Sequence, residues 1–366
     1  MGALRLAALF SLVFAAHAQA VTFVYVSNAD DGEIGLYTLR PDGTLQPGQR
    51  FKAGPSLGPM SVSPDKRFIV AASRAKPFTA YSFSIDRATG ALRPAGSGPL
   101  AESLPYIEHD RSGRYLLGAS YGGNLVSVNP VKPDGSVGEP SQVIPTARNA
   151  HAIILDRTGR FAFVPHLGTD QVFQFTFDER SGRLAANTPP VVQMKAGSGP
   201  RHLVVSPDNR FVFLLNELTG TVSTLALENG LLKEVDTVSS LPPESKLGPG
   251  MPRPQPNRDV SNDVWASDLH VTPNGKFLYA AERTSSSIAA FAVDTASGRL
   301  SYLGNTSTEK QPRGFAIGPA GRYLVVSGEK SDTISSYRIE PSGLLLHLGK
   351  YSTGKGSNWV EIVSFD

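Results

Sequence analysis

The 366-residue chain is 40% hydrophobic and 18% charged, so it can bury a substantial core and lacks the composition of a disordered protein. Its 35 basic and 32 acidic residues leave a net charge of +3 with no basic run, which argues against a nucleic-acid partner. The absence of cysteine excludes disulfides, thiol nucleophiles, iron–sulfur clusters and cysteine-ligated zinc. The 36 glycines and 28 prolines favour many turns and short strands over long helices.

Residues 1–20, with the sequence MGALRLAALFSLVFAAHAQA, are typical of a secretory signal peptide. Arg5 precedes an apolar run of 11 residues from Leu6 to Ala16, which is too short to span a bilayer. The small residues around Gln19 predict cleavage before Val21. A buried N-terminal strand is the alternative interpretation. We therefore predict an exported protein, periplasmic or secreted, with no membrane span after cleavage.

One sequence pattern recurs seven times along the rest of the chain. A polar turn with Asp or Gly is followed by Lys or Arg, an aromatic residue and a short apolar run, as in SPDKRFIVAAS and DRTGRFAFVPH. The aromatic residues of the copies, here called the anchors, are Phe23, Phe68, Tyr115, Phe161, Phe211, Phe277 and Tyr323. Successive anchors are 45, 47, 46, 50, 66 and 46 residues apart, which indicates one structural unit per copy.

Each unit contains four short apolar runs separated by turn residues. In the fifth unit the runs are RHLVVS, RFVFLLNE, TVSTLALE and LLKEVDTVS. Four-stranded antiparallel units of this length are the blades of a β-propeller, so we predict an all-β, seven-bladed propeller in a single domain over residues 21–366. The first copy lacks an upstream strand, while a spare run, NWVEIV, follows the last copy. The C-terminal strand should therefore complete the first blade and close the ring.

The one long interval between anchors contains a segment rich in proline and polar residues. This segment, SSLPPESKLGPGMPRPQPNRDVSND, covers residues 239–263. We interpret it as an inserted loop, either a disordered excursion or a lid over the centre of the ring.

The anchors also predict which residues meet at one end of the central channel. The inner strand of a blade starts about ten residues before the anchor, and the second strand ends five or six residues after it. Because these strands are antiparallel, both positions reach the same mouth of the channel. At these positions, or one residue further along, lie His151, His166, Arg201, His202, Glu217, Asp268, Glu282, Arg283, Arg313 and Glu329.

This set of side chains favours an anionic or polarised substrate. Arg201, Arg283 and Arg313 can hold a carboxylate or phosphate, because a guanidinium group offers two parallel hydrogen bonds. His151 can transfer protons near neutral pH, and Glu217 can orient the arginines or act as a base on water.

Several of these residues have structural alternatives. Arg201 and Glu217 could pair only to lock a blade, and His151 and His166 could be hydrogen-bonded core histidines. Arg313 could pack against a neighbouring blade. Three further residues are interpreted as structural, with the third in the channel wall or core: Glu282, Glu329 and His270.

No metal or cofactor is predicted. The sequence contains no HExxH motif, and a calcium or magnesium ion on channel carboxylates is the weaker alternative. It also contains no Gly-x-Ser-x-Gly elbow and no glycine-rich phosphate loop, which argues against serine hydrolases and nucleotide enzymes.

Four segments of the chain resemble the seven-bladed propeller lactonase family. They are NAHAIILDRTGRFAFVPHLGTDQVFQF, GPRHLVVSPDNRFVFLLNE, SDLHVTPNGKFLYAAERT and QPRGFAIGPAGRYLVVSGEKSDTISSY. The family includes propeller-type bacterial 6-phosphogluconolactonases and fungal 3-carboxy-cis,cis-muconate lactonizing enzymes. The resemblance covers essentially the whole mature chain and is strongest from residue 149 to residue 359.

The resemblance implies an active site made of a histidine, an arginine, a glutamate and a second arginine. By motif, these catalytic residues fall on His151, Arg201, Glu217 and Arg283. Four other residues of the rim are predicted to bind substrate, and these are His166, His202, Asp268 and Arg313. No obligate metal is implied.

We therefore expect an exported lactonase that hydrolyses a sugar-derived or carboxylated lactone at one mouth of the channel. The export signal does not suit 6-phosphogluconolactone, which is an intracellular intermediate. A muconate-type lactonizing cycloisomerase and a non-enzymatic binding platform are the alternatives, because a propeller fold alone does not fix function. The expected partner is a small lactone or other anionic substrate, and no oligomeric state follows from the sequence.

Overall fold

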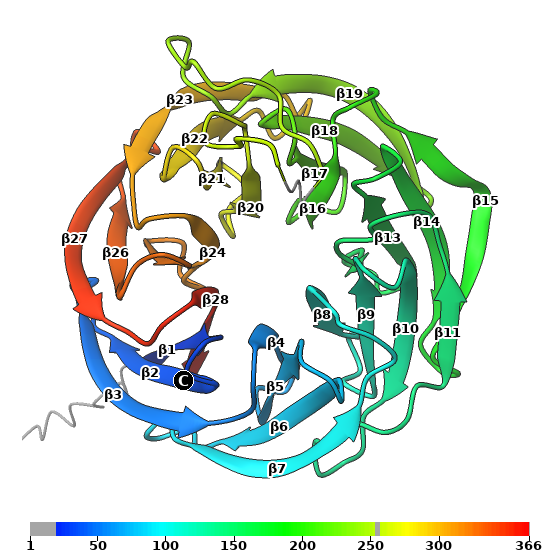
Figure 1. The fold of residues 1–366 in the computed structure, drawn as a ribbon, viewed down its shortest axis with the longest axis vertical. Coiled ribbons are helices and arrows are strands. Elements are labelled where there is room, and N and C mark those ends of the chain that lie inside the picture. The colour runs from blue at the N-terminus through cyan, green and yellow to red at the C-terminus, as the bar shows by residue number, and fades with distance from the viewer. Residues whose placement is uncertain (1–19, 253–256, 366) are drawn as a thin grey trace, which may run out of the picture.

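A computed structural model describes residues 20–252 and 257–365, and these residues form 28 strands and no helix. Viewed down the short axis, the strands are grouped into blades arranged in a ring (Figure 1). There are seven four-stranded sheets, and every strand pairs antiparallel with its neighbours. The prediction of an all-β, seven-bladed propeller is therefore confirmed.

The blades follow one another along the chain. Blades 1 to 3 are built from β1 (Val21–Asn28), β2 (Glu33–Leu39), β3 (Leu45–Lys52), β4 (Leu57–Val62), β5 (Phe68–Ser73), β6 (Thr79–Ile85), β7 (Leu92–Pro99), β8 (Tyr106–His109), β9 (Tyr115–Ser120), β10 (Leu125–Pro130) and β11 (Gln142–Pro145). Blades 4 and 5 are built from β12 (Ile154–Leu155), β13 (Phe161–His166), β14 (Gln171–Asp178), β15 (Arg183–Gln193), β16 (Pro200–Val205), β17 (Phe211–Asn216), β18 (Thr221–Glu228) and β19 (Leu231–Ser239). Blades 6 and 7, with the closing strand, are built from β20 (Ala266–Val271), β21 (Phe277–Glu282), β22 (Ser287–Val293), β23 (Leu300–Ser307), β24 (Pro312–Ile317), β25 (Tyr323–Gly328), β26 (Thr333–Ile339), β27 (Leu345–Ser352) and β28 (Ser357–Phe365).

The C-terminal strand closes the ring, as the sequence predicted. β28 pairs antiparallel with β1 from Val21–Phe365 to Asn28–Ser357 and becomes the innermost strand of blade 1. This pairing gives partners to two strand edges that would otherwise be exposed.

The anchors recur because each one fills the same contact between two blades. Each of the seven anchor rings packs against a glycine in the turn between the two outer strands of the next blade, and every one of these glycines has a positive φ. The pairs are Phe23 with Gly90, Phe68 with Gly135, Tyr115 with Gly182, Phe161 with Gly230, Phe211 with Gly298, Phe277 with Gly343 and Tyr323 with Gly43. A side chain at the glycine would collide with the ring, so the aromatic residue and the glycine together form a packing contact that is repeated between all neighbouring blades.

Replacing Gly230 with alanine is expected to lower the free energy of unfolding by about 3 kcal/mol, because backbone strain and overpacking add up. The residue has φ 78°, and an added Cβ would meet the Phe161 ring. Gly197 provides the matched control, since it also has a positive φ of 75° but open space where a Cβ would lie. Gly197→Ala should cost only about 1 kcal/mol. Urea denaturation measures both values, and equal losses would contradict the packing argument.

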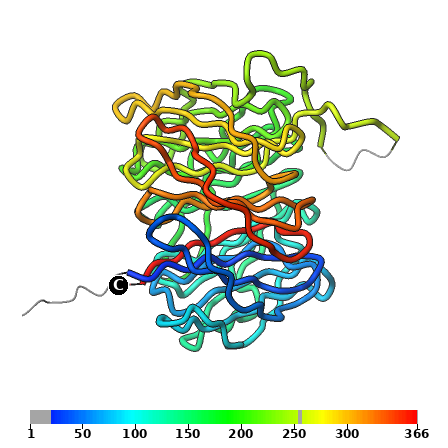
Figure 2. The backbone as a smooth tube through the Cα atoms, turned by 90° about the vertical axis from the view of Figure 1, so that its left-hand side faces the viewer, coloured from blue at the N-terminus to red at the C-terminus, as the bar shows by residue number. Residues whose placement is uncertain are grey.

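The predicted inserted loop lies between β19 and β20. Apart from Ser239, which ends β19, its described residues contain one isolated bridge, between Gly248 and Asp263, and no strand of a blade. The Gly250 N–H donates to the Leu218 carbonyl, so the base of the loop is fastened beside the end of β17. Figure 2 shows the segment standing out from the face of the disc opposite the C-terminus.

The predicted signal peptide lies almost entirely outside the described residues, which begin at residue 20. Among the described residues, no helix is long and apolar enough to cross a membrane.

Candidate active site

β-Bulges turn consecutive residues of several inner strands toward the mouth and channel. The register between β16 and β17 shifts between Pro200 and His202, so Arg201 falls on the bulge. The same irregularity occurs in β20 between Ala266 and Leu269, and in β24 between Pro312 and Phe315. A bulge interrupts the strict alternation of side chains and can re-aim one of them. Neighbouring residues such as Arg201 and His202 can therefore both contribute to one site.

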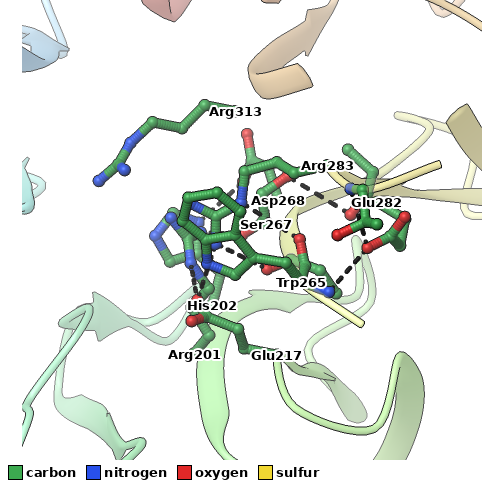
Figure 3. A network of polar contacts seen from close by, with 12 residues as sticks. Arg201, His202, Glu217, Trp265, Ser267, Asp268, Glu282, Arg283 and Arg313 are labelled. Carbon is green, nitrogen blue, oxygen red and sulfur yellow. Dashed lines mark hydrogen bonds and ion pairs between the residues drawn. The ribbon is translucent and has the colours of Figure 1, made fainter. Parts of the chain in front are cut away.

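Arg201, Glu217 and Arg283 form a buried ion cluster (Figure 3). The Oε2 atom of Glu217 lies 2.8 Å from Nε of Arg201 and 3.0 Å from Nη2 of Arg283. Only 1% of the Arg201 residue and 2% of the Arg283 residue are exposed. The three residues come from two neighbouring blades, so the contact forms only when the ring is assembled.

The two guanidinium groups are held by backbone oxygens as well as by the carboxylate. Arg201 donates from Nη1 to the Ser267 carbonyl. Arg283 donates from Nε to the Trp265 carbonyl at 3.2 Å and from Nη2 to the Ala266 carbonyl at 3.1 Å. Its guanidinium carbon also lies 3.7 Å from the centre of the Trp265 ring, a cation–π contact. These contacts fix the direction of both positive charges before any substrate arrives.

Both buried arginines keep their charge at neutral pH. Burial lowers the pKa of Arg201 to about 9, and it lowers the pKa of Arg283 to about 10. With one carboxylate between two guanidinium groups, the cluster carries excess positive charge. Such a site stabilises an anion or an oxygen that becomes negative during a reaction.

Arg313 stands apart from this cluster in Figure 3 and forms a second, more exposed pair with Glu329. Its Nη1 atom lies 3.3 Å from Glu329 Oε1, with 18% and 23% of the two side chains exposed. Burial acts to raise the pKa of Glu329, but the charges of Arg313, Arg283, Arg201 and Arg74 outweigh it and lower that pKa below its ordinary value. This electrostatic coupling indicates that the two arginine groups belong to the same positively charged mouth.

The predicted residues His202 and Asp268 lie together in the channel wall. His202 Nδ1 is 2.9 Å from Asp268 Oδ1, and the other carboxylate oxygen lies 3.2 Å from His270 Nε2. The three residues line a cavity of about 310 Å³ together with Tyr106, Phe315, Trp359 and Glu361. The cavity is therefore lined by both polar and aromatic side chains.

His151 also lies close to this group. Its ring centre is 5.1 Å from that of His202 and 5.5 Å from that of Tyr121, both in edge-on contacts. Burial and then the charge of Arg201 hold the pKa of His151 well below its usual range, so the imidazole is neutral. Its Nδ1 is buried without a hydrogen bond within the described part of the chain.

His166 is placed elsewhere, in contrast to the expectation that it binds substrate. Its side chain is completely buried, and its ring lies 4.3 Å from that of Phe173. Phe173 packs against the apolar cluster between blades 3 and 4. The end of β13 does reach the mouth, but the side chain of its last residue points between the blades because of strand alternation.

Glu282 has the structural role that the sequence suggested. Its two oxygens accept hydrogen bonds from the backbone N–H groups of Trp265, Thr284 and Ser285. It therefore fixes the turn after β21 and the end of the inserted segment. Sequence reasoning did not single out Trp265, and the only signal for it was its position just before an inner strand.

Two half-buried carboxyl groups on the channel strands resist ionisation. Burial raises the pKa of Glu108 to about 8 and the pKa of Glu361 to about 7. Trp359 donates a hydrogen bond of 2.8 Å to Glu361, whereas Glu108 Oε2 is buried without a partner among the described residues. These groups are protonated at mildly acidic pH, and their ionisation at higher pH lowers the stability of the folded protein.

Glu108→Gln is expected to stabilise the protein at pH 8 and to leave it almost unchanged at pH 5. Over most of this pH range the Glu108 carboxyl is ionised in the unfolded state but still protonated in the folded state, whose pKa is about 8, so wild-type stability falls as pH rises. The amide has no proton to lose, and the gain at pH 8 should be about 2 kcal/mol. Thermal unfolding at both pH values measures it. Glu228→Gln, at an exposed carboxylate, is the control, and an equal effect there would contradict the prediction.

Comparisons with known proteins identify the family. The model described as "Lactonase, 7-bladed beta-propeller" matches residues 20–362. The chain is 35% identical over 344 residues to the 6-phosphogluconolactonase of Erwinia tasmaniensis, covering 94% of this chain and 99% of that one. It is 36% identical over 344 residues to the 6-phosphogluconolactonase of Serratia proteamaculans, covering 93% and 98%.

A solved structure agrees with these relatives. The periplasmic gluconolactonase PpgL of Pseudomonas aeruginosa superposes with a TM-score of 0.83 at 28% identity, covering 94% of this chain and 99% of that one. The family resemblance noted in the sequence is thus confirmed. This chain belongs to the seven-bladed β-propeller lactonase family.

Proposed function

We propose that this protein hydrolyses a lactone at the mouth of the propeller channel that carries Arg201, Glu217 and Arg283. The single observation that supports this proposal most is the buried cluster in which one carboxylate fixes two guanidinium groups. Ester hydrolysis passes through a tetrahedral oxyanion, and fixed positive charges in a water-poor site stabilise it. The names of the relatives, 6-phosphogluconolactonase and gluconolactonase, support the same reaction.

Each residue then has a part in the reaction. Arg201 and Arg283 stabilise the developing oxyanion, and Glu217 holds the two groups in place. Arg313, the more exposed arginine, contacts an anionic or hydroxyl group further along the substrate. His151 binds the lactone at the rim through its unpaired Nδ1. Glu217 is a poor candidate for the general base, because one of its oxygens is shared by two cations.

We further propose that the protein is exported and that its substrate is a sugar-derived or carboxylated lactone without a phosphate. The N-terminal segment carries the features of a signal peptide. The structural relative PpgL is described as periplasmic, which is consistent with this location.

A substrate panel tests the function. Mature protein starting at Val21 is incubated with glucono-δ-lactone, 6-phosphogluconolactone, a carboxylated lactone and 3-carboxy-cis,cis-muconate. Acid release at constant pH measures ring opening, and ultraviolet absorbance measures muconate cyclisation. Ring opening of a non-phosphorylated lactone supports the proposal. Cyclisation alone would make the protein a cycloisomerase, and binding without turnover would make it a binding platform.

A further inference from the structure

The pairing of His202 with Asp268 fixes the hydrogen positions on the imidazole. Nδ1 of His202 lies 2.9 Å from Asp268 Oδ1, so it donates its proton to the carboxylate. The proton of the neutral ring is then on Nδ1, and Nε2 carries a free lone pair. Nε2 is buried and has no hydrogen-bond partner in the described part of the chain. An oriented imidazole with an unused basic nitrogen is what general-base catalysis on water requires.

Asp268 is itself held from several directions. The N–H of Leu269 donates to Oδ1 at 3.0 Å, and His270 and the N–H of Phe315 lie 3.2 Å and 3.4 Å from Oδ2. Burial acts to raise the pKa of Asp268, but the charge of His270 and the hydrogen bond from His202 outweigh it and lower that pKa. Asp268 therefore remains a carboxylate and a hydrogen-bond acceptor across the working pH range.

The pair lies next to the proposed oxyanion site. His202 follows Arg201 directly on β16 and lies in edge-on contact with His151, with ring centres 5.1 Å apart. Its ring also lines the channel cavity of about 310 Å³, while Nε2 itself lies in the buried part of the ring. Glu217 is a weaker candidate for the base, because its Oε2 atom is already bound by two guanidinium groups.

We propose that His202 is the general base of the lactonase reaction and that Asp268 is its positioning residue. This inference rests on the proposed function. Water attacks the lactone carbonyl carbon while one of its protons moves to Nε2 of His202. The ring carbon–oxygen bond then breaks, and the imidazolium returns the proton to the leaving ring oxygen. The product is a hydroxy acid, whose carboxyl proton is released to solvent.

The surrounding charges make the basicity of His202 depend on whether substrate is bound. Burial and then the charge of Arg201 lower the pKa of His202 to about 3, so the ring is neutral before the substrate binds. An anionic substrate or a developing oxyanion on the arginines offsets part of this positive field. The basicity of Nε2 therefore increases at the moment when it takes the proton.

The first variant is His202→Ala. We expect kcat on the best lactone of the panel to fall by about 100- to 10,000-fold, with KM changed by less than about threefold. Added imidazole should restore part of kcat by entering the space left by the side chain, an effect that loss of structure does not produce. His109→Ala is the matched control, because the His109 side chain is also buried and is hydrogen-bonded to Ser61, away from the proposed catalytic residues. It should destabilise the protein but retain kcat.

The second variant, Asp268→Asn, preserves shape and tests positioning. Its amide can donate to Nδ1 and so place the ring proton on Nε2, which should lower kcat by about 10- to 1,000-fold. Circular dichroism melts report whether each variant is folded. Wild-type kcat in either folded variant, or no imidazole rescue of His202→Ala, would overturn the inference. Absence of turnover by the wild-type enzyme on every lactone would instead reject the proposed function.

Discussion

Replacing Glu217 with alanine is expected to lower the free energy of unfolding by about 3–5 kcal/mol, because removal of one partner leaves buried charges uncompensated. Both guanidinium groups that it neutralises are almost inaccessible to water, and they come from different blades. Without the carboxylate, two like charges face each other in a site of low polarity. Urea denaturation of the variant, followed by tryptophan fluorescence, measures the loss.

Glu329→Ala is the matched control for this prediction. Glu329 also pairs with an arginine at the mouth, but the side chains of that pair are 18% and 23% exposed. Water can compensate Arg313, so this variant should lose only about 1 kcal/mol. Similar losses in the two variants would show that burial of the Arg201–Glu217–Arg283 cluster does not increase the cost of removing its carboxylate.

The sequence predicted the ring because the repeated aromatic residue fills the same contact between each pair of neighbouring blades. The aromatic anchor recurs once per unit, and in the structure each anchor packs against a turn glycine of the next blade. The same anchors placed Arg201, Glu217 and Arg283 at one mouth, and the structure brings these residues together. Their catalytic or binding roles remain predictions.

The direction of individual side chains could not be predicted in the same way. Strand alternation would send Arg201 and His202 to opposite sides, and only the bulge between Pro200 and His202 changes this. His166 shows the opposite case, because the anchor spacing put it at the mouth while its side chain is buried beside Phe173. Trp265 lies outside the repeat altogether, so no internal comparison could point to its contact with Arg283.

Replacing Arg283 with lysine is expected to lower kcat on a neutral lactone such as glucono-δ-lactone by about 100- to 1,000-fold, the usual cost of losing one oxyanion donor. The guanidinium group is positioned by Glu217, by the carbonyls of Trp265 and Ala266, and by the Trp265 ring. An ammonium group is a point charge and cannot keep these planar contacts. Because the lost interaction develops only in the transition state, KM should change little.

Arg313→Lys is the matched variant at the same mouth, and it should behave in the opposite way. Its guanidinium group is partly exposed and lies in the more open pair with Glu329, so we expect it to contact the distal part of the substrate. With a neutral lactone its kcat should remain near that of the wild type, whereas KM for a carboxylated lactone should rise several-fold. Steady-state kinetics on both substrates separates the two arginines. If Arg283→Lys retained kcat while raising only KM, Arg283 would be a ground-state binding residue, and the oxyanion would have to be stabilised elsewhere at the mouth.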